Sequence, residues 1–297
     1  MTVFKVFEAR DFLNSRVVGQ EEAIREFLKG FVEARSLGKD RISFFFVGPT
    51  GVGKTELAKA IADFFKEKFL WNYGRIDLNN FTERHSISTL LGSPRGYIGS
   101  EEGGVLPNIL RKGLYTVLHL DEVEKAHPSL YRIFMQLLDE GMVQEVSSGE
   151  FVPFKGIAIF TSNLFQETVG ELTQKVKDSS LRELLIREVL SGRFDKVGDF
   201  VAPSVLERDL QHLTKLGMER GFPPEFIGRI DKIVVFTPLS ERDLFLLAVR
   251  ELSKLGVSTD GVDLIVKKYL SVAHEFGVRV FLKKVQEEGL KRKLLAD

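Results

Sequence analysis

Residues 48–55 carry the strongest chemical signal in this sequence. They are, in order, Gly48, Pro49, Thr50, Gly51, Val52, Gly53, Lys54 and Thr55. This is the complete glycine-rich motif in which backbone N–H groups turn inward around phosphate oxygens. In this motif the lysine reaches the β and γ oxygens of a nucleoside triphosphate, and the Thr55 hydroxyl takes a position on Mg²⁺. The motif therefore predicts nucleotide binding, and a chance glycine-rich turn is the weaker interpretation.

Two adjacent carboxylates, Asp121 and Glu122, end an apolar run at residues 117–120. Phosphoryl transfer requires a carboxylate near the metal ion and a group that orients or deprotonates the attacking water. We assign the metal role to Asp121, through a bound water molecule, and the water-activating role to Glu122. The alternative is a strand whose exposed end happens to be acidic. His119 has no partner at metal-ligand spacing and is interpreted as a core residue.

The elements around these groups alternate between apolar runs and helical patterns. A helix is predicted over residues 55–66, where apolar side chains recur at helical spacing. Buried strands are predicted at residues 42–47, 74–78, 116–120, 156–161 and 232–236. Because helical segments separate most of these strands, the sequence predicts an α/β fold with a parallel sheet covered by helices on both faces. Residues 142–154 are predicted to form a hairpin or excursion before the fourth strand.

A second domain is predicted after Thr237-Pro238. Ser240 and Asp243 have the spacing of a helix cap, and the pattern beyond them is helix, turn and helix. We therefore divide the chain into a lead-in (1–16), a large nucleotide-binding domain (17–237) and a small, mainly helical lid domain (238–297). Residues 165–221 are too many for a bare loop and have helical periodicity, so they are predicted to be an inserted helical segment.

The composition excludes several classes of protein. The 297 residues hold 42 basic and 42 acidic side chains, and this zero net charge argues against nucleic acid as a partner. The absence of cysteine excludes disulfides, thiolate metal sites and cysteine catalysis. The longest apolar runs are far shorter than the roughly 20 residues of a membrane-spanning helix. Since the N-terminus also lacks a signal-peptide pattern, we expect a soluble, cytoplasmic protein with no membrane partner.

Several stretches together resemble one known family. They are VVGQE from Val17, GPTGVGKTELAKA from Gly48, RIDLNNFTERHSISTLLGSPRGYIGSEEGG from Arg75, LDEVEKAHP from Leu120, TSNL from Thr161 and PPEFIGRID from Pro223. This set resembles the second ATPase ring of the Clp unfoldases and disaggregases, within the AAA+ superfamily. The resemblance implies the AAA+ parallel sheet, binding of ATP with Mg²⁺, and ATP hydrolysis.

The resemblance also implies roles for residues that carry little signal alone. Val17 and Val18 would line the adenine pocket. Asn163 matches the first sensor, which holds the attacking water. Arg229 matches the arginine finger, which enters the neighbouring subunit's site, and Arg279 matches the second sensor, which contacts the nucleotide phosphates.

Tyr97, within the sequence GYIG, matches the aromatic pore loop that grips polypeptide through its ring face. The resemblance thus implies a homo-oligomeric ring, a hexamer in the family, that acts on a polypeptide substrate. Two positions depart from the family's pattern: Gly228 stands where the family usually has Asn, and Val280 stands where it usually has Pro.

Other features of the family have no match in the sequence. They are a first ATPase ring, an N-terminal substrate domain, a coiled-coil middle domain, and an Ile-Gly-Phe or Ile-Gly-Leu tripeptide for docking a barrel protease. The small domain is expected to be abbreviated. Residues 165–221 are longer than the family's spacer, and we expect them to carry any partner-specific function.

Three hypotheses for the function follow. The first is a ring-shaped ATP-driven unfoldase that threads polypeptide past Tyr97. The second is a regulatory ATPase that switches a folded partner without threading, which the inserted segment and the unmatched accessory domains favour. The third is a scaffold that binds ATP and scarcely hydrolyses it. Glu122, Asn163 and Arg229 argue against the scaffold, and Tyr97 favours threading over switching.

Overall fold

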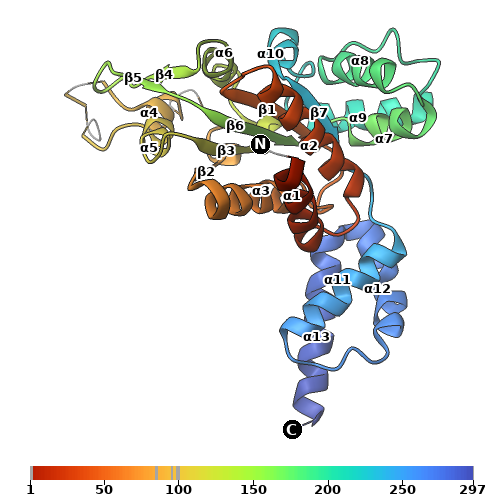
Figure 1. The fold of residues 1–297 in the computed structure, drawn as a ribbon. Coiled ribbons are helices and arrows are strands. Elements are labelled where there is room, and N and C mark those ends of the chain that lie inside the picture. The colour runs from red at the N-terminus through yellow and green to blue at the C-terminus, as the bar shows by residue number, and fades with distance from the viewer. Residues whose placement is uncertain (1–2, 84–85, 95, 98–100, 297) are drawn as a thin grey trace.

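Five parallel strands form the central sheet, in the spatial order β2-β3-β6-β1-β7 (Figure 1). Their bounds are β1 Arg41–Val47, β2 Asn72–Asp77, β3 Thr116–Asp121, β6 Gly156–Ser162 and β7 Lys232–Val235. The computed structural model describes residues 3–83, 86–94, 96–97 and 101–296. All five predicted strands and their parallel pairing are confirmed, with the ends of each within two residues of the prediction.

The sequence of β1 explains why both faces of the sheet are covered. Successive side chains of a strand point to opposite faces, and all the apolar residues of β1 are buried. Phe44 and Phe46 belong to the core on one face, whereas Phe45 and Val47 belong to the core on the other. A strand that is apolar on both sides requires a layer of helices on each face.

Two layers of helices supply this cover. One face carries α1 (Val3–Arg16), α2 (Glu21–Ser36) and α3 (Lys54–Phe69). The other face carries α5 (Val105–Leu110), α6 (Leu130–Glu140) and α10 (Pro224–Arg229), with α4 (Ser86–Leu91) beside α5. Figure 1 shows α3 below the sheet and α6 above it. The lead-in is helical: α1 packs on α3 through the buried side chains of Ala9 and Leu13.

Two excursions leave this α/β layer arrangement. The predicted hairpin is confirmed as the antiparallel pair β4 (Met142–Gln144) and β5 (Phe151–Pro153). Residues 165–221 contain three helices, α7 (Gln166–Lys175), α8 (Ser179–Leu190) and α9 (Pro203–Lys215), joined by turns. Leu172 of α7 and Leu213 of α9 join the core of the sheet, so this segment is packed against the sheet.

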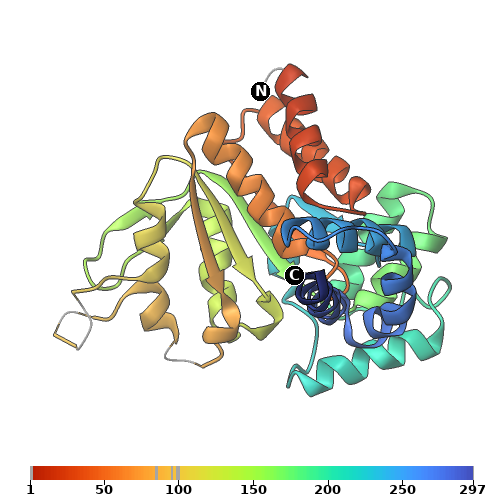
Figure 2. The same ribbon diagram turned by 90° about the horizontal axis from the view of Figure 1, so that it is seen from below.

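Three further helices form a separate unit at the C-terminal end, shown in blue in Figure 1. They are α11 (Glu241–Lys254), α12 (Val262–Phe276) and α13 (Val278–Ala296), which pack around their own apolar core. The predicted cap is confirmed, since Ser240 and Asp243 form a reciprocal capping box at the start of α11. Figure 2, from below, looks along α13. None of the described helices is both long and apolar enough to cross a lipid bilayer.

Gln20, a buried residue just before α2, anchors the segment that leads from the sheet to this unit. Its Nε2 donates to the carbonyl of Thr237 at 2.9 Å, and the Thr237 N–H donates to its Oε1 at 3.2 Å. The preceding residue, Gly19, has a φ of +72°, and a Cβ there would lie 2.6 Å from Asp243 Cγ. Only glycine fits this close approach between the two units.

Candidate active site

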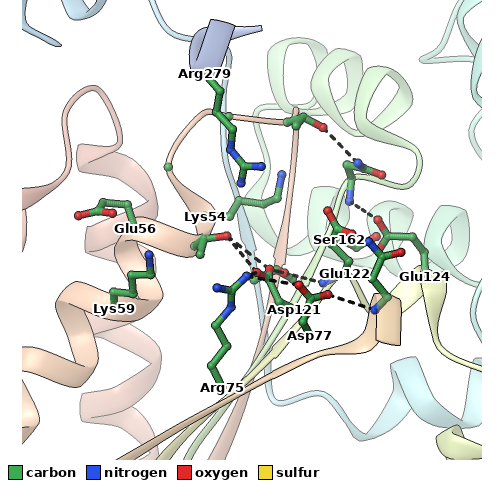
Figure 3. A pocket seen from close by; sticks show the side chains of 17 residues that line it. Lys54, Glu56, Lys59, Arg75, Asp77, Asp121, Glu122, Glu124, Ser162 and Arg279 are labelled. Atoms are coloured by element: carbon green, nitrogen blue, oxygen red, sulfur yellow. Dashed lines mark hydrogen bonds and ion pairs between the residues drawn. The ribbon is translucent and has the colours of Figure 1, made fainter. Parts of the chain in front are cut away.

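A cleft of about 420 Å³ lies at the carboxyl ends of β1, β3 and β6, where parallel strands of an α/β sheet bring their following loops together. Figure 3 shows the side chains that line it. Its lining is strongly polar and consists of Thr50, Gly51, Gly53, Lys54, Thr55, Glu56, Lys59, Arg75, Asp77, Asn79, Asp121, Glu122, Glu124, Thr161, Ser162, Asn163 and Arg279. The structure thus gathers in one cleft three residues of the glycine-rich loop (residues 48–53), Lys54 and Thr55 after it, both predicted carboxylates and two of the residues suggested by resemblance.

The glycine-rich loop joins β1 to α3 in a conformation that side chains would prevent. Gly48 has a φ of +149°, and a Cβ there would lie 2.4 Å from the backbone oxygen of Phe236. Gly53 has a φ of +114° and forms the N-cap of α3. The loop therefore ends at the N-terminus of a 16-residue helix, where unpaired N–H groups and the helix dipole favour an anion.

Lys54 lies beneath this loop. Its ammonium donates to the carbonyl oxygens of Gly48 and Pro49 at 2.5 and 2.6 Å. Burial lowers the pKa of Lys54 to about 8, although the charges of Glu124 and Asp121 raise it in part. An anion bound in the cleft would favour the protonated form of Lys54 and raise its pKa again. The charge of Lys54 is therefore coupled to the occupancy of the cleft.

Asp121 is buried and surrounded by donors. Burial alone would raise its pKa, but hydrogen bonds and charge from His119, and hydrogen bonds from Thr161 and Arg75, hold the pKa well below its ordinary value. The Nη2 of Arg75 donates to Asp121 Oδ2 at 2.7 Å. Thr161 Oγ1 also donates to Asp121. Asp121 is thus an ionised carboxylate at neutral pH.

The donor set around Asp121 fits Mg²⁺. The Thr55 hydroxyl lies 3.4 Å from both carboxylate oxygens, so a hard oxygen donor and a carboxylate are adjacent. No group of three or more His, Cys, Asp or Glu side chains suited to a metal is found among the described residues. A cation held here would therefore rely on nucleotide oxygens and water for its remaining ligands, which is the usual arrangement for Mg²⁺.

Glu122 has the left-handed backbone conformation, with a φ of +56°, directly after β3. This conformation costs about 1 kcal/mol or more for a non-glycine residue, and residues that keep it cluster at functional sites. The Glu122 N–H donates to Thr161 Oγ1 at 3.1 Å. Thr161 therefore links the Asp121 carboxylate to the backbone of Glu122.

His119 is completely buried in the middle of β3, as its interpretation as a core residue predicted. It also touches the site, since its Nε2 lies 3.4 Å from Asp121 Oδ1 and its Nδ1 lies 3.3 Å from the Tyr73 hydroxyl.

Asn163 and Arg279 line the cleft from two different parts of the fold. Asn163 follows β6, and its Nδ2 donates to the Thr50 hydroxyl of the glycine-rich loop at 3.1 Å. Arg279 lies in the first turn of α13, so the C-terminal unit contributes a cation to the cleft. A second, more apolar cleft of about 630 Å³ adjoins the first and shares Thr50, Gly51 and Arg279 with it.

Seven other predicted residues are not part of the polar lining: Gly48, Pro49 and Val52 of the glycine-rich loop, and Val17, Val18, Arg229 and Tyr97. Val17 is buried behind the glycine-rich loop, close enough that a Cβ added to Gly53 would lie 3.3 Å from Val17 Cγ1. Val18 is partly exposed. Arg229 lies near the amino-terminal end of β1, whereas the cleft lies at the carboxyl ends of the strands. Its backbone oxygen accepts a hydrogen bond from Ser43 Oγ in the first half of β1.

Tyr97 is 70% exposed, and its N–H donates to the Pro94 carbonyl in a turn. The neighbouring Ile98 and Gly99 of the predicted pore loop lie outside the described residues.

Eight residues that line the cleft were not predicted from the sequence, and three of them contact predicted site residues: Arg75, Glu124 and Thr161. For Arg75 the only signal was a charge within a predicted strand, and because Arg75 is exposed on the edge strand β2, that charge does not by itself require a polar partner. Register supplies that partner, since β2 pairs with β3 and sets Arg75 opposite His119, two residues before Asp121. Glu124 and Thr161 had no comparable signal.

A parallel sheet with a glycine-rich loop after β1 and carboxylates at the end of β3, with β6 between these two strands, fits the AAA+ class of α/β proteins. The chain belongs to the family described as AAA domain (Cdc48 subfamily), whose model matches residues 39–233. It is 33% identical to the chaperone protein ClpB of Bacteroides thetaiotaomicron, over 99% of this chain and 33% of that protein. It is 39% identical to ClpB of Aquifex aeolicus, over 81% of this chain and 22% of that protein.

Solved structures agree with these relatives. A closed-state reconstruction of Hsp104 with ATPγS and FITC-casein matches 98% of this chain and 48% of that chain, with a TM-score of 0.71 and 27% identity. The fold is therefore that of the second-ring ATPase module of Clp-type proteins, as the resemblance implied. The chain spans about a third or less of the length of the curated relatives it matches.

Proposed function

We propose that this protein is an ATP-hydrolysing, ring-forming motor of the Clp type, which unfolds or remodels polypeptide with Tyr97 as a gripping residue. The observation that carries the proposal is the polar cleft, in which Lys54, Asp121 and Glu122 meet beneath a glycine-rich loop. A phosphate-binding cation, a metal-binding carboxylate and a water-activating carboxylate are the groups that phosphoryl transfer requires. The relatives named as ClpB chaperones support the extension from ATP hydrolysis to polypeptide remodelling.

Each cleft residue has a task in this proposal. The glycine-rich loop and Lys54 bind the phosphates, and Thr55 and Asp121 hold Mg²⁺, which neutralises phosphate charge when bound. Glu122 orients and deprotonates the attacking water, and Asn163 holds that water from the end of β6. Arg279 draws the C-terminal unit toward the phosphates.

The base of the nucleotide would occupy the apolar cleft that adjoins the polar one. This cleft is lined by glycine-rich loop residues and by apolar side chains of the C-terminal unit, including Leu244, Ala273 and Val278. Val17 and Val18 would complete the adenine pocket from behind the loop.

The position of Arg229 supports a ring. It lies across the sheet from its own chain's cleft, so a catalytic role for it requires the cleft of a second copy. Asp139 Oδ2 accepts from its Nε at 2.6 Å and the Glu225 carbonyl accepts from its Nη1 at 2.6 Å, which hold the side chain in place. A homo-oligomer, with the family's hexamer as the expected form, would set each Arg229 beside a neighbour's nucleotide.

A nucleotide-driven switch that acts on a folded partner is the second candidate. It is favoured by the inserted segment, because α7 begins only three residues after Asn163 and could transmit changes at the nucleotide site. In that case α7, α8 and α9, rather than Tyr97, would contact the partner.

One experiment separates the two candidates. The ATPase rate is measured against protein concentration, with and without an unfolded polypeptide, for the parent, Tyr97→Ala and Tyr97→Phe. Threading predicts that the polypeptide stimulates the parent and the Phe variant, which keeps the ring face, and does not stimulate the Ala variant. Equal stimulation in all three proteins would contradict threading. No stimulation in any of them would favour the switch.

A further inference from the structure

Glu124 is a buried carboxylic acid in the cleft for which the proposed reaction has no use. It lies in the short 3₁₀ helix at Val123–Lys125 and is only 4% exposed. Burial raises the pKa of its carboxyl above the ordinary value. A buried carboxyl group costs free energy unless hydrogen bonds compensate it, so its presence needs an explanation.

One oxygen of Glu124 has a specific partner. Its Oε1 accepts from the backbone N–H of Asn163 at 3.4 Å, whereas its Oε2 is buried without a hydrogen-bond partner in the described part of the chain. Asn163 in turn donates from its side chain to Thr50 at 3.1 Å. These two contacts connect Glu124 through Asn163 to the glycine-rich loop, and Figure 3 labels Glu124 in the cleft.

The backbone at Asn163 needs this support because β6 ends at Ser162, and the chain must turn sharply there. Phe165 has the left-handed conformation, with a φ of +56°, so the N–H groups before it cannot continue the sheet. Side chains accept hydrogen bonds from these N–H groups instead. The Glu124 carboxyl accepts from the N–H of Asn163, and Ser162 Oγ accepts from the N–H of Leu164 at 3.0 Å. Buried backbone donors require such acceptors.

We propose that Glu124 is a positioning residue, which fixes the backbone at Asn163 and so aims the Asn163 amide into the cleft. The inference rests on the proposed ATP hydrolysis and adds a residue to it. Glu124 acts through its hydrogen-bond acceptor, not through its charge. The hydrolysis step therefore depends on an acceptor at position 124, whereas nucleotide affinity does not.

Two substitutions separate the acceptor from the volume of the side chain. Glu124→Gln keeps an acceptor oxygen and removes the charge, and Glu124→Met keeps the volume and removes the acceptor. Glu167→Gln is the control, because Glu167 is an exposed glutamate that pairs with Arg208 outside the cleft. Each protein is assayed for kcat and KM of ATP hydrolysis, for nucleotide Kd, and for amide hydrogen exchange of the peptide that contains Asn163.

Glu124→Met should lower kcat by about 10- to 100-fold, since a displaced group near a reacting centre costs about that much. Its nucleotide Kd, measured well below the pKa of Lys54 so that loss of the Glu124 charge leaves the lysine protonated, should stay within about threefold of the parent, and exchange at residue 163 should accelerate. Glu124→Gln and Glu167→Gln should keep kcat and the exchange rate near the parent values. Combining Glu124→Met with Asn163→Ala should lower kcat no further than Asn163→Ala alone, because both act through one side chain.

Three results would overturn the proposal: an unchanged kcat in Glu124→Met, a Gln variant as slow as the Met variant, or a parallel loss of affinity and rate. If the Met variant exchanges faster throughout the sheet, it is misfolded, and Glu124→Ala takes its place with the same expectations. If polypeptide did not stimulate the parent, the proposed threading motor would be wrong, but the comparison of ATPase rates between the Glu124 variants and the parent would still hold. Hydrogen exchange tests the contact even without turnover.

Discussion

Arg75 donates from Nη2 to Asp121 Oδ2 at 2.7 Å, and the same nitrogen lies 3.7 Å from Asp77 Oδ2. The cation thus occupies one oxygen of the carboxylate that we propose as a metal ligand. A fixed positive charge in this position competes with a metal ion for the carboxylate and repels it.

Arg75→Ala should therefore lower the Mg²⁺ concentration for half-maximal nucleotide binding by about threefold to tenfold. The measurement is a Mg²⁺ titration at constant concentration of a fluorescent ATP analogue. Arg75→Lys keeps a positive charge and should remain closer to the parent. A higher Mg²⁺ requirement in the alanine variant would contradict the prediction and indicate that Arg75 binds phosphate.

Nucleotide affinity should weaken at alkaline pH because of Lys54. Burial lowers its pKa to about 8 in the empty cleft, and phosphate binds the protonated form. Below pH 8 the lysine is already charged, so affinity should be level. Above pH 8 each further unit should raise the Kd of Mg²⁺-free ATP by up to about tenfold. Equilibrium binding between pH 7 and 9.5 measures this, and a Kd that stays constant to pH 9.5 would refute it.

Arg229→Ala should lower turnover in the assembled ring by about 10³-fold and leave the Kd of ATP nearly unchanged. The reason is that this side chain lies outside its own chain's cleft. Mixing the variant with Lys54→Ala should restore part of the activity, since a mixed ring sets an intact finger beside an intact cleft. Arg193→Ala, at an exposed ion pair with Glu188, is the control. Rings shown to be mixed that recover no activity would exclude catalysis across the subunit boundary.

The fourth prediction concerns acid stability and the hairpin β4–β5. Arg111 contacts Glu145 through two nitrogens, at 3.1 and 2.7 Å, and this bonding is the main cause that lowers the pKa of Glu145 from 4.5 to about 2. Because the pKa of Glu145 is lower in the folded than in the unfolded state, its ionised carboxylate stabilises the fold above about pH 4.5. This contribution is lost as the pH falls toward 2.

Glu145→Gln should accordingly lower the free energy of unfolding at pH 7 by about 1–2 kcal/mol, a value reduced for the partial exposure of Arg111. The difference from the parent should shrink as the pH is lowered from 5 to 3. Denaturant unfolding at a series of pH values measures it. Glu150→Gln removes a more exposed contact of Arg111 and should have a smaller effect. A difference that is constant with pH would contradict the assignment to this ion pair.

The sheet could be predicted because its strands are continuous apolar runs, as in β1, and because the glycine-rich motif fixes which strand precedes the helix. The two carboxylates after β3 could be predicted for the same reason, since the end of a buried strand exposes its polar residues at one edge. The helical nature of residues 165–221 followed from their length and periodicity.

The supporting contacts could not be predicted, because they depend on register and on residues distant in sequence. Thr161 fixes Asp121 only because β6 lies beside β3. The docking of α1 on α3 joins residues about fifty positions apart, and no local pattern in α1 specifies that partner. The roles of Asn163, Arg229 and Arg279 came from resemblance, because no local pattern around these residues specifies a role.

The hydrogen bonds between Gln20 and the backbone of Thr237 have a mechanical consequence. Because they hold both polar groups of Thr237 to the start of α2, any rotation of the C-terminal unit must take place beyond that residue, at residues 238–240. α13 begins beside the cleft with Arg279 and runs for 19 residues, about 28 Å. A rotation of about 10° would move a point at that distance by about 5 Å, so if Arg279 contacts the phosphates as proposed, a small change there would become a displacement the size of a side chain at the far end of the helix.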